Sequence, residues 1–85
     1  MELIQAAKAK ELSKANREIL VSRAVEKLWR EVKAEIEDGI ASGLSYGYVE
    51  ISGEIEREAF ESIEPFLEAA GYKVAYSGEY QKISW

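Results

Sequence analysis

The sequence predicts one α+β domain over residues 1–85, with a long N-terminal helix, a strand, a second helix and a C-terminal β-hairpin. The first 38 residues contain neither glycine nor proline and are rich in helix-favouring Ala, Glu, Lys, Leu and Arg. The later residues alternate between strand-forming runs and glycines that mark turns. We expect a three-stranded sheet covered on one face by the helices, because two packed layers can bury a small core.

Two apolar stripes run along the N-terminal helix but point in different directions. One repeats every three or four residues and forms a single helix face: Val21, Val25, Leu28, Val32 and Ile36. The other consists of Leu12, Ala15 and Ile19, and it lies roughly 130° around a straight helix from the first. Either the helix breaks near residues 13–16, or the N-terminal stripe faces a second subunit in a homo-oligomer.

Glycines and proline predict the remaining boundaries. Gly39 is expected to follow the first helix, with a loop over residues 39–47 and a strand over residues 44–52. Ser52 or Gly53 caps the second helix, Pro65 kinks it or starts a fresh turn, and Gly71 ends it. Its expected apolar face comprises Ile55, Ala59, Ile63, Phe66, Leu67 and Ala70. The last fourteen residues predict a hairpin with its turn at Ser77–Gly78 or Gly78–Glu79, and with Ile83 and Trp85 facing the core.

Composition excludes several classes of function. The chain has no cysteine and no histidine, which removes disulfides, thiolate nucleophiles, the commonest general base and the commonest metal ligand. We therefore expect no enzyme activity, metal or cofactor. The net charge of −5 argues against direct nucleic-acid binding, because phosphates require cationic partners. No signal peptide and no apolar run long enough to span a membrane is present, so we expect a cytoplasmic protein that does not bind membranes.

Two groups of side chains are candidates for binding a partner. An acidic stripe on the second helix comprises Glu54, Glu58, Glu61 and Glu68, with Glu64 at its margin. This stripe is a solvated face, a contact for a basic partner or a carboxylate metal site, and the metal site is the least favoured because no His or Asn accompanies the acids. Tyrosines on or near the expected strands, Tyr46, Tyr48, Tyr76 and Tyr80, either pack on the sheet or bind a partner. The leading hypothesis is one acidic and tyrosine-rich surface that binds a protein.

A small-molecule site is the alternative hypothesis. Backbone N–H groups of the glycine-rich loop, around Gly43 and Gly47, could receive a phosphate. The tyrosines and a basic residue of the first helix, such as Arg23 or Arg30, would complete the site. Because a chain of this length can hardly enclose a large pocket, this hypothesis favours a nucleotide-like ligand held between subunits.

The end of the chain carries a resemblance. Residues 66–74, which end in Gly71-Tyr72-Lys73-Val74, and the terminal Ile83-Ser84-Trp85 resemble the ends of many small proteins encoded by tailed phages and prophages. The resemblance covers roughly the last quarter of the chain and transfers no catalytic residue. It implies a phage accessory protein that binds and inhibits a host protein, including proteins of host defence, in the host cytoplasm.

Overall fold

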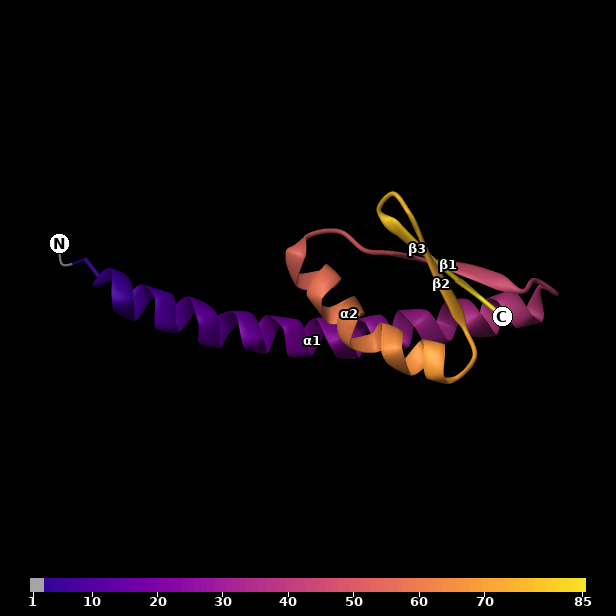
Figure 1. Ribbon diagram of the computed structural model, residues 1–85, viewed down its shortest axis with the longest axis horizontal. Coiled ribbons are helices and arrows are strands. Elements are labelled where there is room, and N and C mark those ends of the chain that lie inside the picture. The colour runs from indigo at the N-terminus through magenta and orange to yellow at the C-terminus, as the bar shows by residue number, and fades with distance from the viewer. Residues whose placement is uncertain (1–2) are drawn as a thin grey trace.

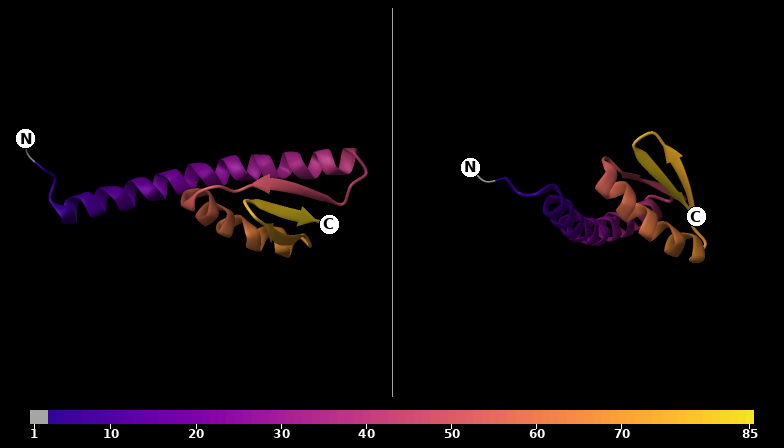
Figure 2. Two further views of the ribbon diagram at one scale, coloured as in Figure 1. Left: turned by 90° about the horizontal axis from the view of Figure 1, so that it is seen from above. Right: turned by 60° about the vertical axis from the view of Figure 1, so that its left-hand side comes forward.

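The computed structural model describes residues 3–85 and confirms the predicted α+β architecture and order of elements (Figure 1). These elements are α1 (Ala6–Ala41), β1 (Tyr46–Glu50), α2 (Glu54–Ala69), β2 (Lys73–Ser77) and β3 (Tyr80–Ser84). Helix α1 packs against α2 and β1, and α2 also packs against β2. Both helices therefore lie on one face of the sheet, as predicted (Figure 2).

Helix α1 is one unbroken helix of 36 residues, so the predicted break near residues 13–16 is wrong. The side chains of Ser13 and Asn16 are exposed, and strong helix formers flank both residues. All described residues before Val21 are exposed, so no buried contact forces the chain to change direction there. The helix can instead propagate outward from its packed C-terminal half.

The C-terminus of α1 also differs from the prediction. The helix ends at Ala41, and Gly43 rather than Gly39 adopts the left-handed conformation that ends it, with φ of 73°. The Gly43 N–H donates to the Ile40 carbonyl (3.1 Å), and the Leu44 N–H donates to the Gly39 carbonyl (2.8 Å). Gly39 is buried inside the helix, where the ring of Trp85 covers it.

Glycines frame helix α2. Gly53 precedes it with φ of 85°, and the Ser52 N–H donates to Glu56 Oε2 at 3.0 Å. Pro65 lies inside the continuous helix and does not start a new one. Gly71, with φ of 96°, ends the helix as predicted.

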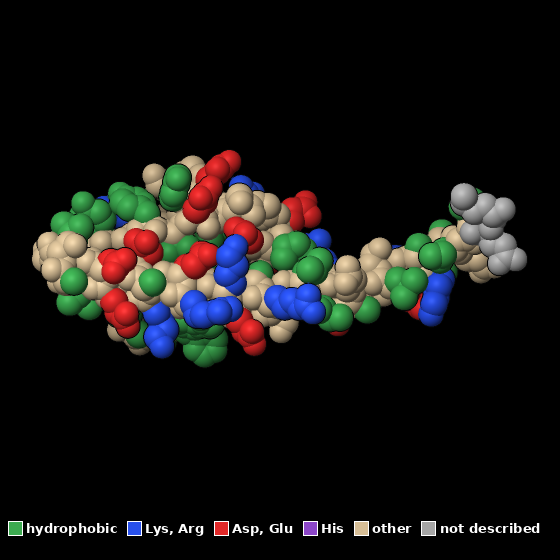
Figure 3. Space-filling view, turned by 180° about the vertical axis from the view of Figure 1, so that it is seen from behind, with side chains coloured by type: hydrophobic (Ala, Val, Ile, Leu, Met, Phe, Trp, Pro, Cys, Tyr) green, Lys and Arg blue, Asp and Glu red, His purple; other side chains and the backbone are tan. Residues whose placement is uncertain are grey.

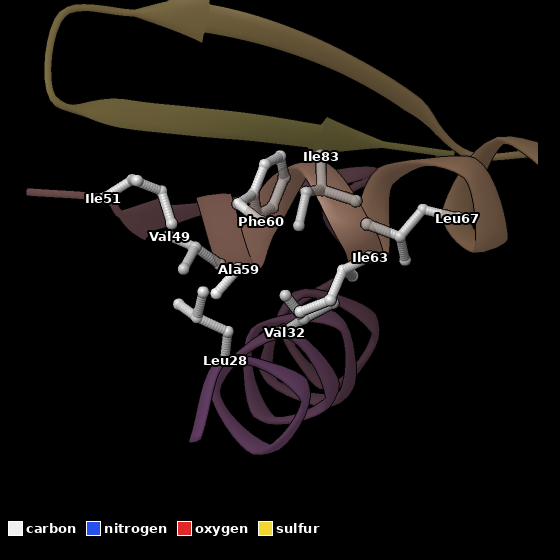
Figure 4. Packing of buried hydrophobic residues seen from close by; sticks show 9 residues of the cluster. All are labelled: Leu28, Val32, Val49, Ile51, Ala59, Phe60, Ile63, Leu67 and Ile83. Atoms are coloured by element: carbon white, nitrogen blue, oxygen red, sulfur yellow. The ribbon is translucent and has the colours of Figure 1, made fainter. Parts of the chain in front are cut away.

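The core lies between the helices and the sheet (Figure 4). Leu28 and Val32 of α1 lie beside Ala59 and Ile63 of α2 in this view, and Ile83 reaches down from β3. The buried apolar residues are Leu28, Val32, Val49, Ile51, Ala59, Phe60, Ile63, Leu67 and Ile83. The predicted stripe of α1 is thus confirmed at its centre, while Val21, Val25 and Ile36 pack at the margin.

Two aromatic predictions for the core need correction. Phe60 is buried at 2% exposure, whereas the predicted Phe66 is 68% exposed and packs against Trp29, with ring centroids 6.3 Å apart. Trp85 is 38% exposed and lies at the edge of the core, edge-on to Tyr72 at 6.1 Å. The core therefore contains one large aromatic side chain, Phe60, among mostly aliphatic ones.

The sheet has the order β1-β3-β2 with both pairs antiparallel. Gly47, Val49, Gln81 and Ile83 are buried toward the helices, and their neighbours along each strand point to the other face. Gly47 permits a close approach of β1 to α1, since a Cβ atom there would lie 3.2 Å from the Glu35 carbonyl oxygen. No helix covers the other face of the sheet within the described residues.

The N-terminal part of α1 projects from the rest of the molecule (Figures 1 and 2). The projection makes the molecule 60 Å long, against 23 and 20 Å in the other two directions. Neither helix of residues 3–85 combines the length and the apolar character needed to cross a membrane.

Candidate functional site

The face of the sheet that the helices leave open carries three tyrosines. Tyr46 and Tyr48 are alternate residues of β1, and Tyr80 and Lys82 are alternate residues of the adjoining β3. In the antiparallel register, Tyr48 lies opposite Lys82, and Glu50 lies opposite Tyr80, so these side chains share one side of the sheet. We call Tyr46, Tyr48, Tyr80 and Lys82 the tyrosine face.

Contacts among these side chains order the tyrosine face in advance. Tyr46, Tyr48 and Tyr80 are 37%, 43% and 47% exposed, so each ring is partly supported and partly available. The rings of Tyr46 and Tyr48 meet edge to face with centroids 5.8 Å apart. Lys82 Nζ lies 4.9 Å from the centroid of the Tyr46 ring, within range of a cation–π interaction. A surface that is already ordered loses less conformational entropy when a partner binds.

The strand residues on this side are slightly basic within an acidic chain. Ser84 of β3 pairs with Tyr46 of β1 and with Lys73 of β2, so Lys73 lies on the same side of the sheet as Tyr46. The strand residues on this side therefore carry two lysines, Lys73 and Lys82, and one carboxylate, that of Glu50. Neither lysine stands out in the sequence, because their position depends on the strand order and register. Strict alternation of Tyr80, Lys82 and Ser84 is the signal that could have placed Lys82 beside the tyrosines.

The predicted acidic stripe lies on α2 on the side away from the core. At about 100° per residue, Glu54 is about 180° from the buried Ile63 and Glu61 is about 160° from it. Arg17 of α1 binds the first two members of the stripe. Its Nε lies 2.9 Å from Glu58 Oε2, and its Nη1 lies 3.5 Å from Glu54 Oε2.

These contacts give part of the stripe a structural role. The hydrogen bond to Glu58 and the charge of that carboxylate raise the pKa of the Arg17 guanidinium above its ordinary value. Lys27 makes a second link between the helices, 3.9 Å from Glu56. Glu61 and Glu68 are exposed and make no ion pair with other described residues. They are the members of the stripe that remain available to a partner.

The structure does not bring the acidic stripe and the tyrosines together. The acidic stripe is on the outer side of α2, and the tyrosine face is on the opposite side of the sheet, with the core between them. Tyr76 is separate from both. It pairs with the buried Gln81, so it lies on the helix-covered side, where its ring is 69% exposed at the edge strand β2. The surface predicted as one unit therefore consists of distinct surfaces.

The residues of the alternative small-molecule site are also apart. Gly43 lies in the turn after α1, and Gly47 is buried in β1 against the Glu35 backbone. Arg23 and Arg30 are exposed on a side of α1 about 160–180° from the buried Val32. The helix itself separates these arginines from the glycines.

Other concave or acidic features offer little chemistry. A cleft of about 400 Å³ between α1 and the start of α2 is lined by Lys14, Arg17, Val21 and Glu58, among others. The ion pair between Arg17 and Glu58 already occupies its main polar groups. Within residues 3–85, no group of three or more Asp or Glu side chains is placed to hold a metal ion.

The C-terminal run that carries the phage resemblance is structural in this fold. Gly71 ends α2, Val74 pairs with Ile83 across the hairpin, and Trp85 covers Gly39 of α1. These residues position β3 and therefore the tyrosine face. No protein-family model, curated protein or solved structure matches this chain.

Proposed function

We propose that this chain is a non-enzymatic binding protein that captures a protein partner on its tyrosine face. The observation that carries the proposal is the cluster of three partly exposed tyrosines on the uncovered side of the sheet, with Lys82 beside them. Tyrosine supplies a large contact area with a polar tip and only two side-chain torsions to restrict. Such residues are enriched at protein interfaces and among the residues that dominate binding energy.

The shape of this surface favours a macromolecule over a small ligand. Small-molecule sites are concave and bury most of their ligand. The tyrosine face lies on two neighbouring antiparallel strands, β1 and β3, and its side chains stand side by side on the open surface of the sheet. Lys73 and Lys82 favour a partner surface that presents carboxylates or carbonyl oxygens.

The resemblance of the C-terminal run supplies the biological context of the proposal. A phage accessory protein would work in the host cytoplasm, and its partner would be a host protein, with the proteins of host defence as the first class to test. Capture on a broad face would inhibit the partner by covering its surface. The absence of histidine and cysteine from the sequence supports binding rather than catalysis.

Affinity capture with matched surface variants tests this proposal. The wild-type chain, a Tyr48→Ala/Tyr80→Ala variant and a Glu61→Lys/Glu68→Lys variant are each immobilised and exposed to lysate of the cells that naturally contain the protein. We expect the wild type and the glutamate variant to retain the same protein, and the tyrosine variant to lose it. Loss of two interface tyrosines should weaken binding by about a hundredfold or more.

Salt dependence separates the two surfaces in the same experiment. Binding on the tyrosine face should weaken only modestly between low and high salt, because salt screens the contacts of the two lysines but leaves the apolar and hydrogen-bonding contacts of the tyrosines. Binding to the exposed glutamates of α2 should weaken steeply as the charges are screened. Capture that survives the tyrosine substitutions and is lost with the glutamate substitutions would assign the contact to the acidic stripe instead.

A further inference from the structure

A regular seam runs along the side of α1 that faces away from the domain, from the projecting part into the stretch that packs on the core. Its residues follow alternating steps of four and three along the helix, which is the spacing of a helix–helix contact: Lys8, Leu12, Ala15, Ile19, Ser22 and Glu26. Leu12 and Ile19 are 49% and 51% exposed, although they are large and apolar. Ile19 lies about 180° around the helix from the buried Leu28, so the domain leaves this side of α1 open. Figure 3 shows separate hydrophobic side chains along the projection, with charged and other residues between them.

The seam is complementary to itself when two copies run antiparallel. Its positions are spaced symmetrically about Arg17, so a twofold axis at that residue places Lys8 of one chain opposite Glu26 of the other. The same axis sets Leu12 against Ser22, and Ala15 against Ile19. Each of these inner layers therefore pairs a large apolar side chain with a small side chain, which is the arrangement that fills space between helices. The outer layers pair opposite charges.

A parallel pair would lack these matches. It would place Lys8 against Lys8 and Glu26 against Glu26, and like charges in contact oppose association. It would also place the large side chains of Leu12 against each other and leave the Ala15 layer underfilled. Charge and size together therefore select the antiparallel arrangement.

The antiparallel register also brings other exposed apolar residues toward one another. It sets Ala6, the first residue of α1, level with Leu28 of the other chain, so the segment of residues 3–5 ahead of the helix comes near that chain's Trp29 and Phe66. Leu3, Ile4 and Phe66 are 85%, 63% and 68% exposed. Arg17 points toward α2 of its own chain, where it binds Glu58, and does not obstruct the seam.

From this complementarity we infer that the seam on the outer side of α1 binds a second copy of this chain, forming an antiparallel dimer centred on Arg17. The contact from position 8 to position 26 extends for about 27 Å at about 1.5 Å per residue. The inference is independent of the proposed partner on the tyrosine face, since the two surfaces share no residue.

Solution mass across a concentration series tests the dimer on the full chain. We expect the mass measured by light scattering to rise from monomer to dimer, and Ile19→Lys to weaken the dimer by about a hundredfold or more, because each dimer loses two buried copies. Ile40→Lys is the matched control, since Ile40 is an exposed isoleucine of the same helix (61%) with no residue opposite it in the dimer. A wild-type chain that stays monomeric at millimolar concentration would overturn the inference.

A charge exchange tests the register without depending on any apolar substitution. Lys8→Glu and Glu26→Lys should each weaken the dimer, and the double variant should restore it, because the double exchange again pairs opposite charges. Far-ultraviolet circular dichroism would verify that each variant keeps the helical content of the wild type. A double variant that is weaker than both single variants would rule out the proposed pairing.

Engineered cysteines give the direction of the helices directly, because the chain has no cysteine of its own. A mixture of Lys8→Cys and Glu26→Cys chains should form a cross-link between the two variants under mild oxidation. The Lys8→Cys chain alone should remain uncross-linked. Efficient cross-linking of Lys8→Cys with itself would indicate a parallel pair and refute the antiparallel arrangement.

Discussion

Replacement of Gly39 by alanine should destabilise the protein, although alanine is the better helix former. Gly39 lies inside α1, where a Cβ atom would be 2.6 Å from Trp85 Cη2 and 2.9 Å from Cζ2. It would also lie 3.0 Å from the carbonyl oxygen of Tyr46 in β1. Because non-bonded carbon atoms normally touch at about 3.5–4.0 Å, the indole ring must retreat by about 1 Å.

Two opposing effects decide the magnitude. Glycine to alanine in a helix interior stabilises by about 1 kcal/mol. Forcing an extra carbon into a packed site costs about 1–3 kcal/mol. The Trp85 ring can move only in part, since its backbone N–H is bound to the Ser45 carbonyl at 2.9 Å and its ring packs on Tyr72. We expect a net loss of about 1 kcal/mol in the free energy of unfolding.

Urea unfolding followed by circular dichroism measures this change, and Ala34→Gly at an exposed site of α1 calibrates the helix-propensity term. Fluorescence in a Trp29→Phe background reports on Trp85 alone, and its emission should shift to the red as the ring moves into solvent. A Gly39→Ala variant more stable than the wild type, with unchanged Trp85 emission, would refute the close packing of Trp85 on α1.

Other substitutions test the core and turn by the same urea titration. Gln81→Leu should raise the free energy of unfolding by about 1 kcal/mol, because Gln81 Oε1 is buried without a hydrogen-bond partner among the described residues. A free energy of unfolding below that of the wild type would indicate that an ordered water donates a hydrogen bond to Gln81 Oε1. Phe60→Ala should lower the free energy of unfolding by about 3–5 kcal/mol, because the ring is buried. Phe66→Ala should lower it by less than about 1 kcal/mol in dilute solution, because that ring is exposed, and the reverse ranking would contradict their burial. Gly78→Ala should lower the free energy of unfolding by about 1 kcal/mol or more, because the φ of Gly78 is 65°, which strains an alanine. A Cβ atom would meet no neighbour there, so the loss would come from the backbone alone, and an unchanged urea midpoint would contradict the turn conformation.

Local patterns predicted the elements of this fold, but long-range contacts decided several boundaries and core residues. Gly39 resembled a helix end because glycine commonly follows one. Inside α1 it instead leaves room for the ring of Trp85, which lies 46 positions along the chain. Phe60 and Phe66 lie about 60° on either side of Ile63 on α2, so periodicity cannot rank them. The sheet covers the side of Phe60, and this distinction requires the tertiary arrangement.

The candidate site shows the same limit. Alternation in β1 predicts that Tyr46 and Tyr48 share a side, and alternation in β3 does the same for Tyr80 and Lys82. Their assembly into one surface requires β3 to lie next to β1, which depends on a pairing between distant segments. Likewise, helical periodicity predicts the acidic stripe, but the partial neutralisation of that stripe by Arg17 depends on how α1 and α2 cross.

The two apolar stripes of α1 now have a single physical interpretation. A break in the helix would have been needed only if both stripes had to reach the same core, and the unbroken helix shows that they do not. The stripe around Leu28 is buried by this chain, and the seam around Ile19 remains uncovered.

If a second copy covers that seam, the dimer carries two tyrosine faces on one rigid rod. Binding to a partner displayed in several copies would then be strengthened by the linkage of the two faces, whereas binding to a single partner molecule would not change. An Ile19→Lys chain should therefore lose affinity for a densely immobilised partner and keep its affinity for the same partner in solution.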